Sequence, residues 1–409
     1  MIRTLLAAVS ISVAAATCPA IDVDPNPKSL EIPAEVDRKA RELIREFTEP
    51  SYAERERAHR ELKDLGRSAL PALLDALAHD SNPELQLRCE MLLPRATAAD
   101  MKLRVDCFLA DAKNEYDHKL PGAKEYFAIV GQSEASRNLF RDLILSANQT
   151  MLFAVGGKSE DLAKAIVARR NQFRAYTGSN DGSGRFVPTA VDLAAILFAE
   201  SQVSEKSMLP NASQLNQFIN YFNQPNLRNA FEGGPNKENN LALLAKWIDT
   251  REEPIALYYA MNMSSNFKLA NGVNCAKKLL VAKGGAPPSY RGYAMVLIGK
   301  TGKPEDAELL EPLLIDKSIV ATAFQAGGPG VNKRLPVQTR DVALAMCALL
   351  RKQDPADYGL LSRTKSTNDV VKYNIAQHYF DDTDGDADKK RDEAVKKYEE
   401  WKATEKKKR

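Results

Sequence analysis

Residues 51–96 read SYAERERAHRELKDLGRSALPALLDALAHDSNPELQLRCEMLLPRA, and this stretch decides the fold class. Its first part predicts a helix that carries Ala58, Leu62 and Leu65 on one face and ends at Gly66. Its second part predicts another helix, which Ser68 can cap and in whose first turn Pro71 is tolerated. The apolar face of this second helix consists of Leu70, Leu73, Leu74 and Leu77.

A break at Asn82–Pro83 then opens a third helix, which places Leu85, Cys89 and Leu92 on one side. Neither of the two short helices before it can bury its apolar stripe alone, so neighbouring units must stack on each pair. The stretch therefore predicts an all-α protein, an α-solenoid of stacked antiparallel helix pairs.

Three features of this stretch resemble the short HEAT-like repeats of bacterial proteins. They are Arg57–Ala58, Leu65–Gly66 and the segment ALPALLDAL at Ala69–Leu77. A similar order returns in YRGYAMVLIGKTGKPEDAELLEPLLID at residues 290–316, and another repeat-like helix starts near Arg340. Together with the Arg3-containing apolar start of the chain, which is typical of an export signal, these features look like exported bacterial HEAT-repeat proteins whose role is not established.

The middle of the chain is helical in pattern, with segments of 3.6-residue periodicity between Gly, Pro and Asn turns. One exception is the loop TGSNDGSGRFVPT at residues 177–189. The other is residues 318–339, where β-branched residues flank a Gly-Gly-Pro-Gly turn and predict a short hairpin between two repeat helices.

These patterns divide the chain into six predicted regions. The regions are a signal peptide at 1–20, a Pro-rich linker at 21–35, N-terminal HEAT-like repeats at 36–110, an irregular helical middle at 111–282, C-terminal HEAT-like repeats at 283–380, and an acidic linker with a charged terminal helix at 381–409.

The first twenty residues, MIRTLLAAVSISVAAATCPA, have the parts of an export signal. Arg3 provides a positive charge, Leu5–Ala16 form an apolar run too short to span a bilayer, and small residues follow it. We therefore expect a periplasmic, cell-envelope or secreted protein with no transmembrane helix after signal removal. Cys18 raises lipid anchoring as an alternative, although the preceding Thr17 departs from the usual lipobox.

Composition gives no sign of a catalytic or nucleic-acid-binding protein. A net charge of +3 from 57 basic and 54 acidic residues is close to balance, so nucleic acid is not expected as a partner. The four histidines are scattered and are expected at the surface or half-buried.

Four cysteines lie in apolar helices, which predicts buried free thiols: Cys89, Cys107, Cys275 and Cys347. A Cys89–Cys107 disulfide is the alternative. The tripeptide Gly299–Thr301 lacks the earlier glycine of a phosphate-binding loop.

A candidate calcium loop starts at Asp382, between two predicted helices. Four acidic residues occupy its ligand positions one, three, five and twelve: Asp382, Asp384, Asp386 and Glu393. Position six, where the loop needs glycine, is Ala387, and Lys390 adds positive charge at position nine. An acidic linker that caps the terminal helix explains the same residues, so no cofactor is expected, with bound calcium as the alternative.

The function expected from these observations is that of an exported, non-catalytic scaffold that binds a protein partner through its helical surface. Two alternatives are an enzyme related to the HEAT-like lyases and a calcium-responsive assembly module. Loop-facing Tyr290 and Tyr293 are the better contact candidates among the aromatic residues, whereas most others at helical spacing are expected in the core.

Overall fold

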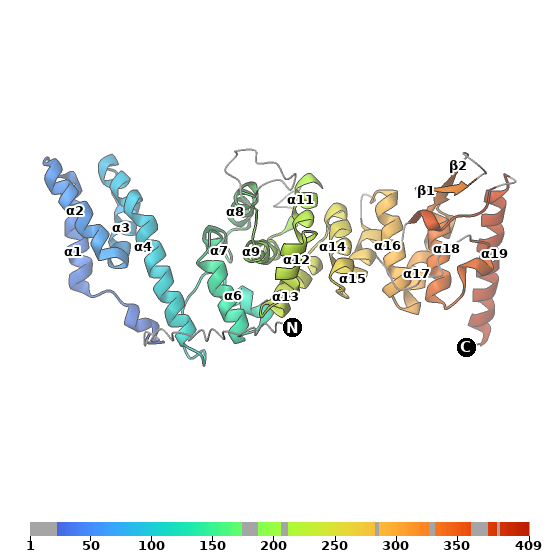
Figure 1. Ribbon diagram of the computed structural model, residues 1–409, viewed down its shortest axis with the longest axis horizontal. Coiled ribbons are helices and arrows are strands. Elements are labelled where there is room, and N and C mark those ends of the chain that lie inside the picture. Colours follow the sequence, from blue (N-terminus) through green and yellow to red (C-terminus); the bar gives the residue numbers. More distant parts are fainter. Residues whose placement is uncertain are drawn as a thin grey trace, which may run out of the picture. The chain divides into compact units, whose positions relative to one another are not determined.

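The computed structural model describes residues 23–173, 187–205, 212–282, 286–326, 332–360, 375–382 and 385–408. Helices make up most of these residues, which confirms the predicted all-α class (Figure 1). The chain divides into two compact units, Met1–Leu120 and Pro121–Arg409. The signal segment at 1–20, Cys18 included, and most of the loop at 177–189 lie outside the described residues.

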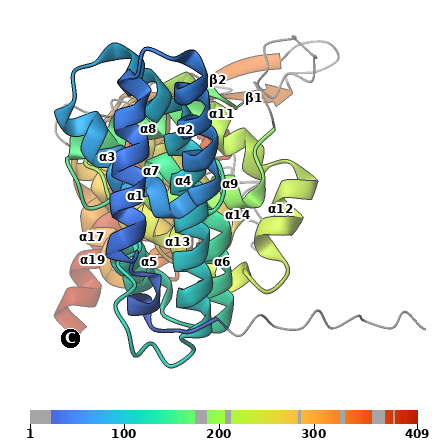
Figure 2. The same ribbon diagram turned by 90° about the vertical axis from the view of Figure 1, so that its left-hand side faces the viewer.

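In the described part of the first unit, residues 23–120, four α-helices pack around one apolar core (Figure 2). They are α1 (Ala34–Arg45), α2 (Tyr52–Leu65), α3 (Leu70–His79) and α4 (Pro83–Ala110). Helix α1 packs against α2 and α3, and α3 packs against α4. Asn82 caps α4, because its side chain accepts hydrogen bonds from the N–H groups of Glu84 and Leu85 at 3.0 and 3.3 Å.

Two details of the prediction for this unit are wrong. Leu73 is fully buried, but Leu74 is 51% exposed, because α3 buries only a narrow face formed with Ala69 and Ala72. Ser68 does not cap α3, because the chain enters the helix directly from a 3₁₀ turn at Gly66–Ala69 and no extended residue precedes it. The free-thiol prediction is confirmed: Cys89, Cys107, Cys275 and Cys347 are buried and unbonded.

The first part of the second unit is helical, as the periodicity predicts. Its helices are α5 (Ala123–Val130), α6 (Glu134–Ile144), α7 (Gln149–Phe153), α8 (Ser159–Asn171), α9 (Ala190–Glu200), α11 (Ala212–Phe222), α12 (Pro225–Glu232) and α13 (Lys237–Asp249). Aromatic side chains predicted for the core are buried there, among them Tyr126, Phe218 and Phe222.

The second part of this unit is a succession of helices that pack on their neighbours along the chain. They are α14 (Pro254–Asn266), α15 (Gly272–Val281), α16 (Pro288–Thr301), α17 (Ala307–Leu310), α18 (Thr339–Leu350) and α19 (Ala387–Lys408). Helix α15 lies between α14 and α16 in sequence and packs on both, while α14 also packs on α16 and α16 on α18. Alternate helices therefore lie next to each other, with α14, α16 and α18 in one layer and α13 and α15 in a second.

Gly299 allows α16 and α18 to approach closely. A Cβ atom at Gly299 would lie 2.3 Å from the sulfur of Met346 on α18, so any side chain there would push the two helices apart. The glycine of the Gly299–Thr301 tripeptide therefore has a packing role in the last turns of α16.

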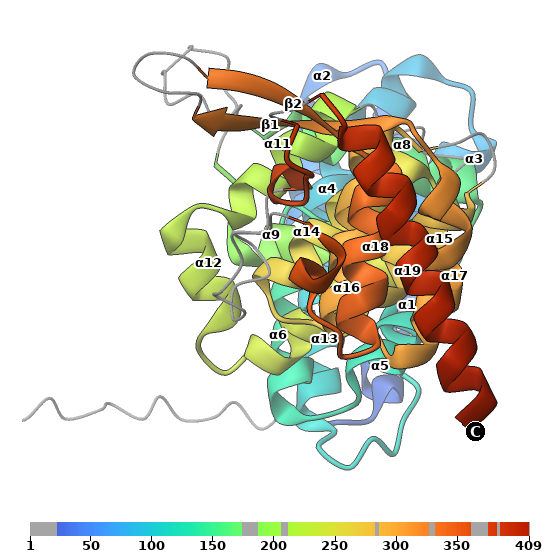
Figure 3. The ribbon, with the colours of Figure 1, turned by 90° about the vertical axis from the view of Figure 1, so that its right-hand side faces the viewer.

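The hairpin predicted at 318–339 is present as the antiparallel pair β1 (Ile319–Ala326) and β2 (Asn332–Gln338). Pro336 of β2 lies opposite Thr322 and has no N–H to donate. Figure 3 shows this hairpin beside α18 and the terminal helix α19. Short 3₁₀ helices connect the remaining elements: η1 (Pro27–Leu30), η2 (Glu46–Thr48), η3 (Gly66–Ala69), η4 (Pro304–Asp306), η5 (Glu311–Ile315), η6 (Pro355–Tyr358) and η8 (Ile375–Gln377).

None of the helices in the described ranges combines the length and the apolar character needed to cross a lipid bilayer.

Candidate interaction site formed by the terminal helix

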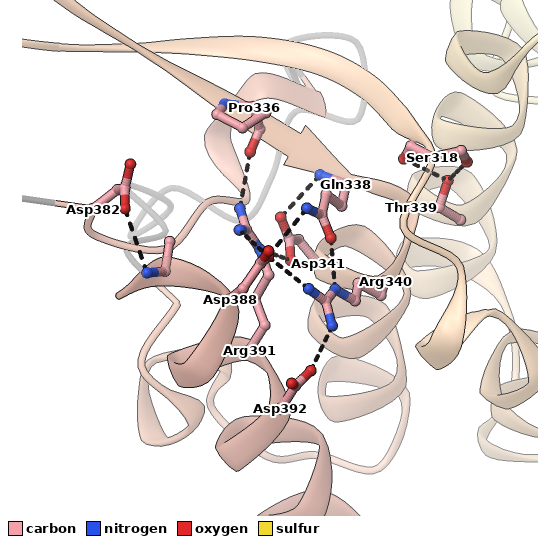
Figure 4. A network of polar contacts seen from close by, with 11 residues as sticks. Ser318, Pro336, Gln338, Thr339, Arg340, Asp341, Asp382, Asp388, Arg391 and Asp392 are labelled. Carbon is pink, nitrogen blue, oxygen red and sulfur yellow. Dashed lines mark hydrogen bonds and ion pairs between the residues drawn. The ribbon is translucent and has the colours of Figure 1, made fainter. Parts of the chain in front are cut away.

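A polar network joins the end of β2, the start of α18 and the start of α19 (Figure 4). Asp341 lies in the first turn of α18, where one carboxylate oxygen accepts a hydrogen bond from the backbone N–H of Gln338 at 2.9 Å. Its second oxygen accepts a hydrogen bond from Nε of Arg391 on α19 at 2.8 Å. Both side chains are almost fully buried. One carboxylate therefore caps α18 and holds α19.

Arg391 is the residue that anchors α19. Besides Asp341, it donates to the backbone carbonyl of Pro336 at 2.9 Å and to Asp388, one turn earlier on α19, at 3.0 Å. Its guanidinium group thus connects strand β2, helix α18 and its own helix.

Arg340 makes a second set of contacts to α19. It donates to Asp392 at 2.6 Å, to Asp388 at 2.7 Å and to the side-chain oxygen of Gln338 at 2.6 Å. Although burial opposes ionisation of Asp388, its hydrogen bond from Arg391 and the charges of Arg340 and Arg391 lower the pKa of this carboxyl group. Asp388 is therefore held in its charged form between two arginines.

The α19 groove lies further along the same helix. It is a hollow of about 690 Å³ lined by Pro304, Glu308, Glu311, Leu350, Arg351, Lys352, Trp401, Lys402 and Glu405. Glu311 of η5 organises it: its carboxylate pairs with Lys402, lies 3.6 Å from Arg351 and accepts a hydrogen bond from the hydroxyl of Tyr398 at 3.2 Å. The groove therefore presents one tryptophan ring among side chains of both charges.

The calcium candidates lie at the start of the same helix. Asp382 accepts a hydrogen bond from the backbone N–H of Ala387 at 3.4 Å, and α19 begins at Ala387, position six of the proposed loop. Glu393 is exposed on α19, and Asp384 lies outside the described residues. Within the ranges that the structure describes, no group of three His, Cys, Asp or Glu side chains could hold a metal. The calcium site stays a prediction, and a rise in melting temperature on calcium addition is its test.

The tyrosines predicted as contact residues meet on neighbouring helices. Tyr258 of α14 stacks on Tyr290 of α16, with ring centroids 4.1 Å apart and planes at 7°. Tyr293, one turn after Tyr290, is exposed, and its ring centroid is 5.6 Å from that of Tyr258. The structure therefore brings Tyr290 and Tyr293 together with a third ring that sequence reasoning placed in the core.

Two histidines are buried, so the prediction that all four are exposed or half-buried is wrong for them. His378 in the second unit is 1% exposed. In the first unit, Nε2 of His118 lies 3.0 Å from Oδ2 of Asp111. The same oxygen accepts a hydrogen bond from the N–H group of Tyr116, and Oδ1 accepts one from the N–H group of Glu115. Burial opposes ionisation of Asp111, but these hydrogen bonds lower its pKa. His118 also lines a cavity of about 790 Å³ with Asp100, Arg104 and Asp117.

Sequence reasoning misses the anchoring role of Arg391, because residues 381–409 predict only an acidic linker and a charged terminal helix. The signal that could have found it is a helical stripe, in which Arg391, Ala394 and Tyr398 are buried on one side. Long-range pairing with Asp341, fifty positions earlier in the chain, is not visible in such a stripe.

Comparisons with protein-family models, with curated proteins and with solved structures find no match to this chain.

Proposed function

We propose that this protein is an exported scaffold with a HEAT-like solenoid architecture, and that it binds a protein partner through the α19 groove. Packing between neighbouring helices of the second unit, with α14, α16 and α18 in one layer, supports the solenoid part of the proposal. Export rests on the features of residues 1–20, and the mass of the mature N-terminus in the native host tests it.

The observation that carries the binding role is the composition of the α19 groove. Tryptophan and arginine dominate the energetics of protein interfaces when they lie in pockets that exclude water. Trp401 and Arg351 line the same hollow, and the acids Glu308 and Glu405 lie there with Lys352 and Lys402. Such a groove suits a protein segment with one apolar anchor side chain and charges of both signs around it.

The arginine network supports the same role, because it fixes the helix that supplies one wall of the groove. A rigid wall lowers the ordering cost of binding. Tyr398 and Lys402 contact Glu311 further along α19, so the helix is held at its start and in its second half.

A photo-crosslinking amino acid at Glu405 tests this proposal in the native cell envelope. We expect it to capture one predominant protein, whereas the same amino acid at exposed Glu54 of the first unit should not. Trp401→Ala should then weaken binding of the purified partner at least about tenfold, equal to about 1.4 kcal/mol. Equal capture at the two positions, or unchanged affinity of the variant, would sink the proposal.

The pair of His118 and Asp111 favours a second candidate function, acid–base catalysis. Because Asp111 holds Nε2 of His118, the other ring nitrogen, Nδ1, would be the base; it is buried, has no hydrogen-bond partner among the described residues, and belongs to a ring that lines a cavity with Asp100 and Asp117. Hydrolysis of p-nitrophenyl acetate by the wild-type chain and its loss in His118→Gln would support this function. Equal rates for the two proteins would exclude a role of His118 in that reaction.

A further inference from the structure

Helix α4 is apolar on two opposite sides. One side, which includes Leu85, Cys89, Leu92 and Ala96, packs in the core of the first unit. The other side carries Leu87, Met91, Pro94 and Ala98, and all four are exposed. Leu87 is 54% and Met91 65% exposed, so large apolar side chains face solvent on two successive turns of this side of the helix. We call these four residues the α4 stripe.

The spacing of the α4 stripe is that of a helix–helix seam. Its residues follow one another at intervals of four, three and four, as do alternating d and a positions of a heptad, so Leu87 and Pro94 are d residues and Met91 and Ala98 are a residues. In the same register the buried residues of α4 occupy the b and f positions: Leu85 and Leu92 are b, and Cys89 and Ala96 are f. The buried side therefore lies opposite the seam. The same helix can therefore pack on its own unit and on a second helix.

The charges beside the stripe are complementary to themselves. Glu90 occupies the g position and Arg95 the following e position, and both are exposed. Neither forms an ion pair with any residue that the structure describes, whereas the neighbouring Arg88 pairs with Glu84 at 2.6 Å and Glu56 at 2.9 Å. In a parallel pair of helices, a g residue faces the e residue five positions later on the other helix.

We propose that the α4 stripe binds a second copy of this chain, with the two α4 helices parallel. Glu90 of each copy then pairs with Arg95 of the other, so one contact forms two ion pairs. An antiparallel pair is disfavoured because e positions would face e positions, which places Arg95 near Arg88 and Arg95 of the second copy. The seam is short and contains Pro94, so the dimer is weak, with a Kd on the order of 10 µM.

Sedimentation equilibrium of the mature full-length chain tests the proposal over two orders of magnitude of concentration. We expect a monomer–dimer equilibrium that Glu90→Arg and Arg95→Glu each weaken at least tenfold, because each brings like charges together twice. The double variant restores the pairs in reversed order and should recover wild-type dimerisation.

Glu54→Arg is the matched control, since Glu54 is exposed on a different helix, α2. Circular dichroism melting establishes that each variant is folded before its association is compared. A chain that is monomeric at every concentration overturns the proposal. A dimer that the single charge reversals leave unchanged overturns it as well, because it would use another surface or another occupant of the stripe.

Discussion

Two arginine networks of the second unit differ in where their carboxylate partners lie. In the middle of the unit, Arg170 pairs with Glu200 and Arg251 lies 3.0 Å from Glu205. Arg251 and both glutamates are buried, and the side chain of Arg170 is only 9% exposed. At the terminal helix, Arg340 and Arg391 are equally buried, but Asp388 and Asp392 are 67% and 66% exposed. The first group is closed to water and the second is open on one side.

The closed group ties several elements to one another. Glu200 accepts a hydrogen bond from the indole N–H of Trp247 at 2.8 Å, and its backbone carbonyl accepts one from Arg251 at 2.9 Å. Glu205 accepts hydrogen bonds from the N–H groups of Glu252 and Glu253, at 2.8 and 2.7 Å, where α14 begins. Loss of either residue of a pair leaves the other charge without its ion-pair partner.

The open group holds one helix. If α19 undocks, Asp388 and Asp392 lose little stabilisation, because they are already largely in water. Only the buried charges of Asp341, Arg340 and Arg391 lose their partners and must be hydrated instead. The difference indicates that the closed group sets the stability of the whole unit, whereas the open group sets the docking of α19 and with it the groove.

Glu200→Ala should have the largest effect, because it removes the partner of Arg170 and the acceptor of Trp247. We expect a loss of about 3–5 kcal/mol in the free energy of unfolding. Urea denaturation followed by tryptophan fluorescence measures this loss in the second unit, where both tryptophans of the chain lie. Glu238→Ala, at an exposed acid of α13, should stay within about 0.5 kcal/mol of wild type. A loss below about 1 kcal/mol for Glu200→Ala would contradict the closed-group assignment.

Acid should destabilise the second unit through His378. Burial, with a smaller contribution from Lys300, lowers the pKa of His378 from 6.5 to about 4. As the pH falls, the unfolded chain therefore takes up the proton at a higher pH than the folded chain does. The contribution of neutral His378 to the free energy of unfolding is complete above pH 6.5 and is lost as the pH falls towards 4. The difference between the two pKa values corresponds to about 3 kcal/mol. Urea denaturation across this pH range should show the free energy of unfolding of the wild type falling with acid more steeply than that of His378→Gln. Parallel curves would contradict the prediction.

Arg391→Met should release α19 without unfolding the rest of the unit. It leaves the carboxylate of Asp341 buried without its ion pair, and we expect a cost of about 2 kcal/mol because undocking of the helix relieves it. Limited trypsin digestion should then cut the lysine-rich α19 faster, and the emission of Trp401 should shift to the red. Glu393→Gln, an exposed position on the same helix, should change neither. Unchanged digestion of Arg391→Met would mean that Tyr398 and Lys402 suffice to dock α19.

Asp392→Asn should have the smallest effect. Its partner Arg340 keeps the contacts to Asp388 and Gln338, and Asp392 itself is largely in water. We expect a change below about 1 kcal/mol that becomes smaller at high salt. A larger loss in the free energy of unfolding, measured by urea denaturation, would show that exposed Asp392 contributes as much as a buried carboxylate of the closed group.

Much of the fold could be predicted from local pattern. Periodicity predicts the helices of residues 51–96 and of the middle, and the Gly-rich turn predicts the hairpin. Exposure of Leu74 could not be predicted, because it depends on which turns of α3 meet α1 and α4. The α4 stripe could not be predicted for a related reason: the side of α4 that carries Leu85, Cys89 and Leu92 is equally apolar, and sequence alone does not say which side the unit buries.

The candidate site was predictable only in part. A charged final helix was expected at 381–409, but its anchor Arg391 depends on Asp341, which only the folded chain brings near. The same holds for His118, whose burial depends on a turn that returns it to Asp111. Ion pairs between residues far apart in the chain cannot be predicted from local periodicity, whereas the helical spacing of Ala394 and Tyr398 does indicate a buried side of α19.

The contact between Arg391 and the carbonyl of Pro336 has a consequence for aggregation. The free edge of a β-strand can form hydrogen bonds with a strand of another chain. In β2, Pro336 has no N–H group to donate to such a strand, and its carbonyl already accepts a hydrogen bond from Arg391. The arginine that docks the terminal helix thus also blocks an edge on which a foreign strand could pair. A chain shortened before α19 would lose that protection, and we expect it to form intermolecular sheet more readily than the whole protein does.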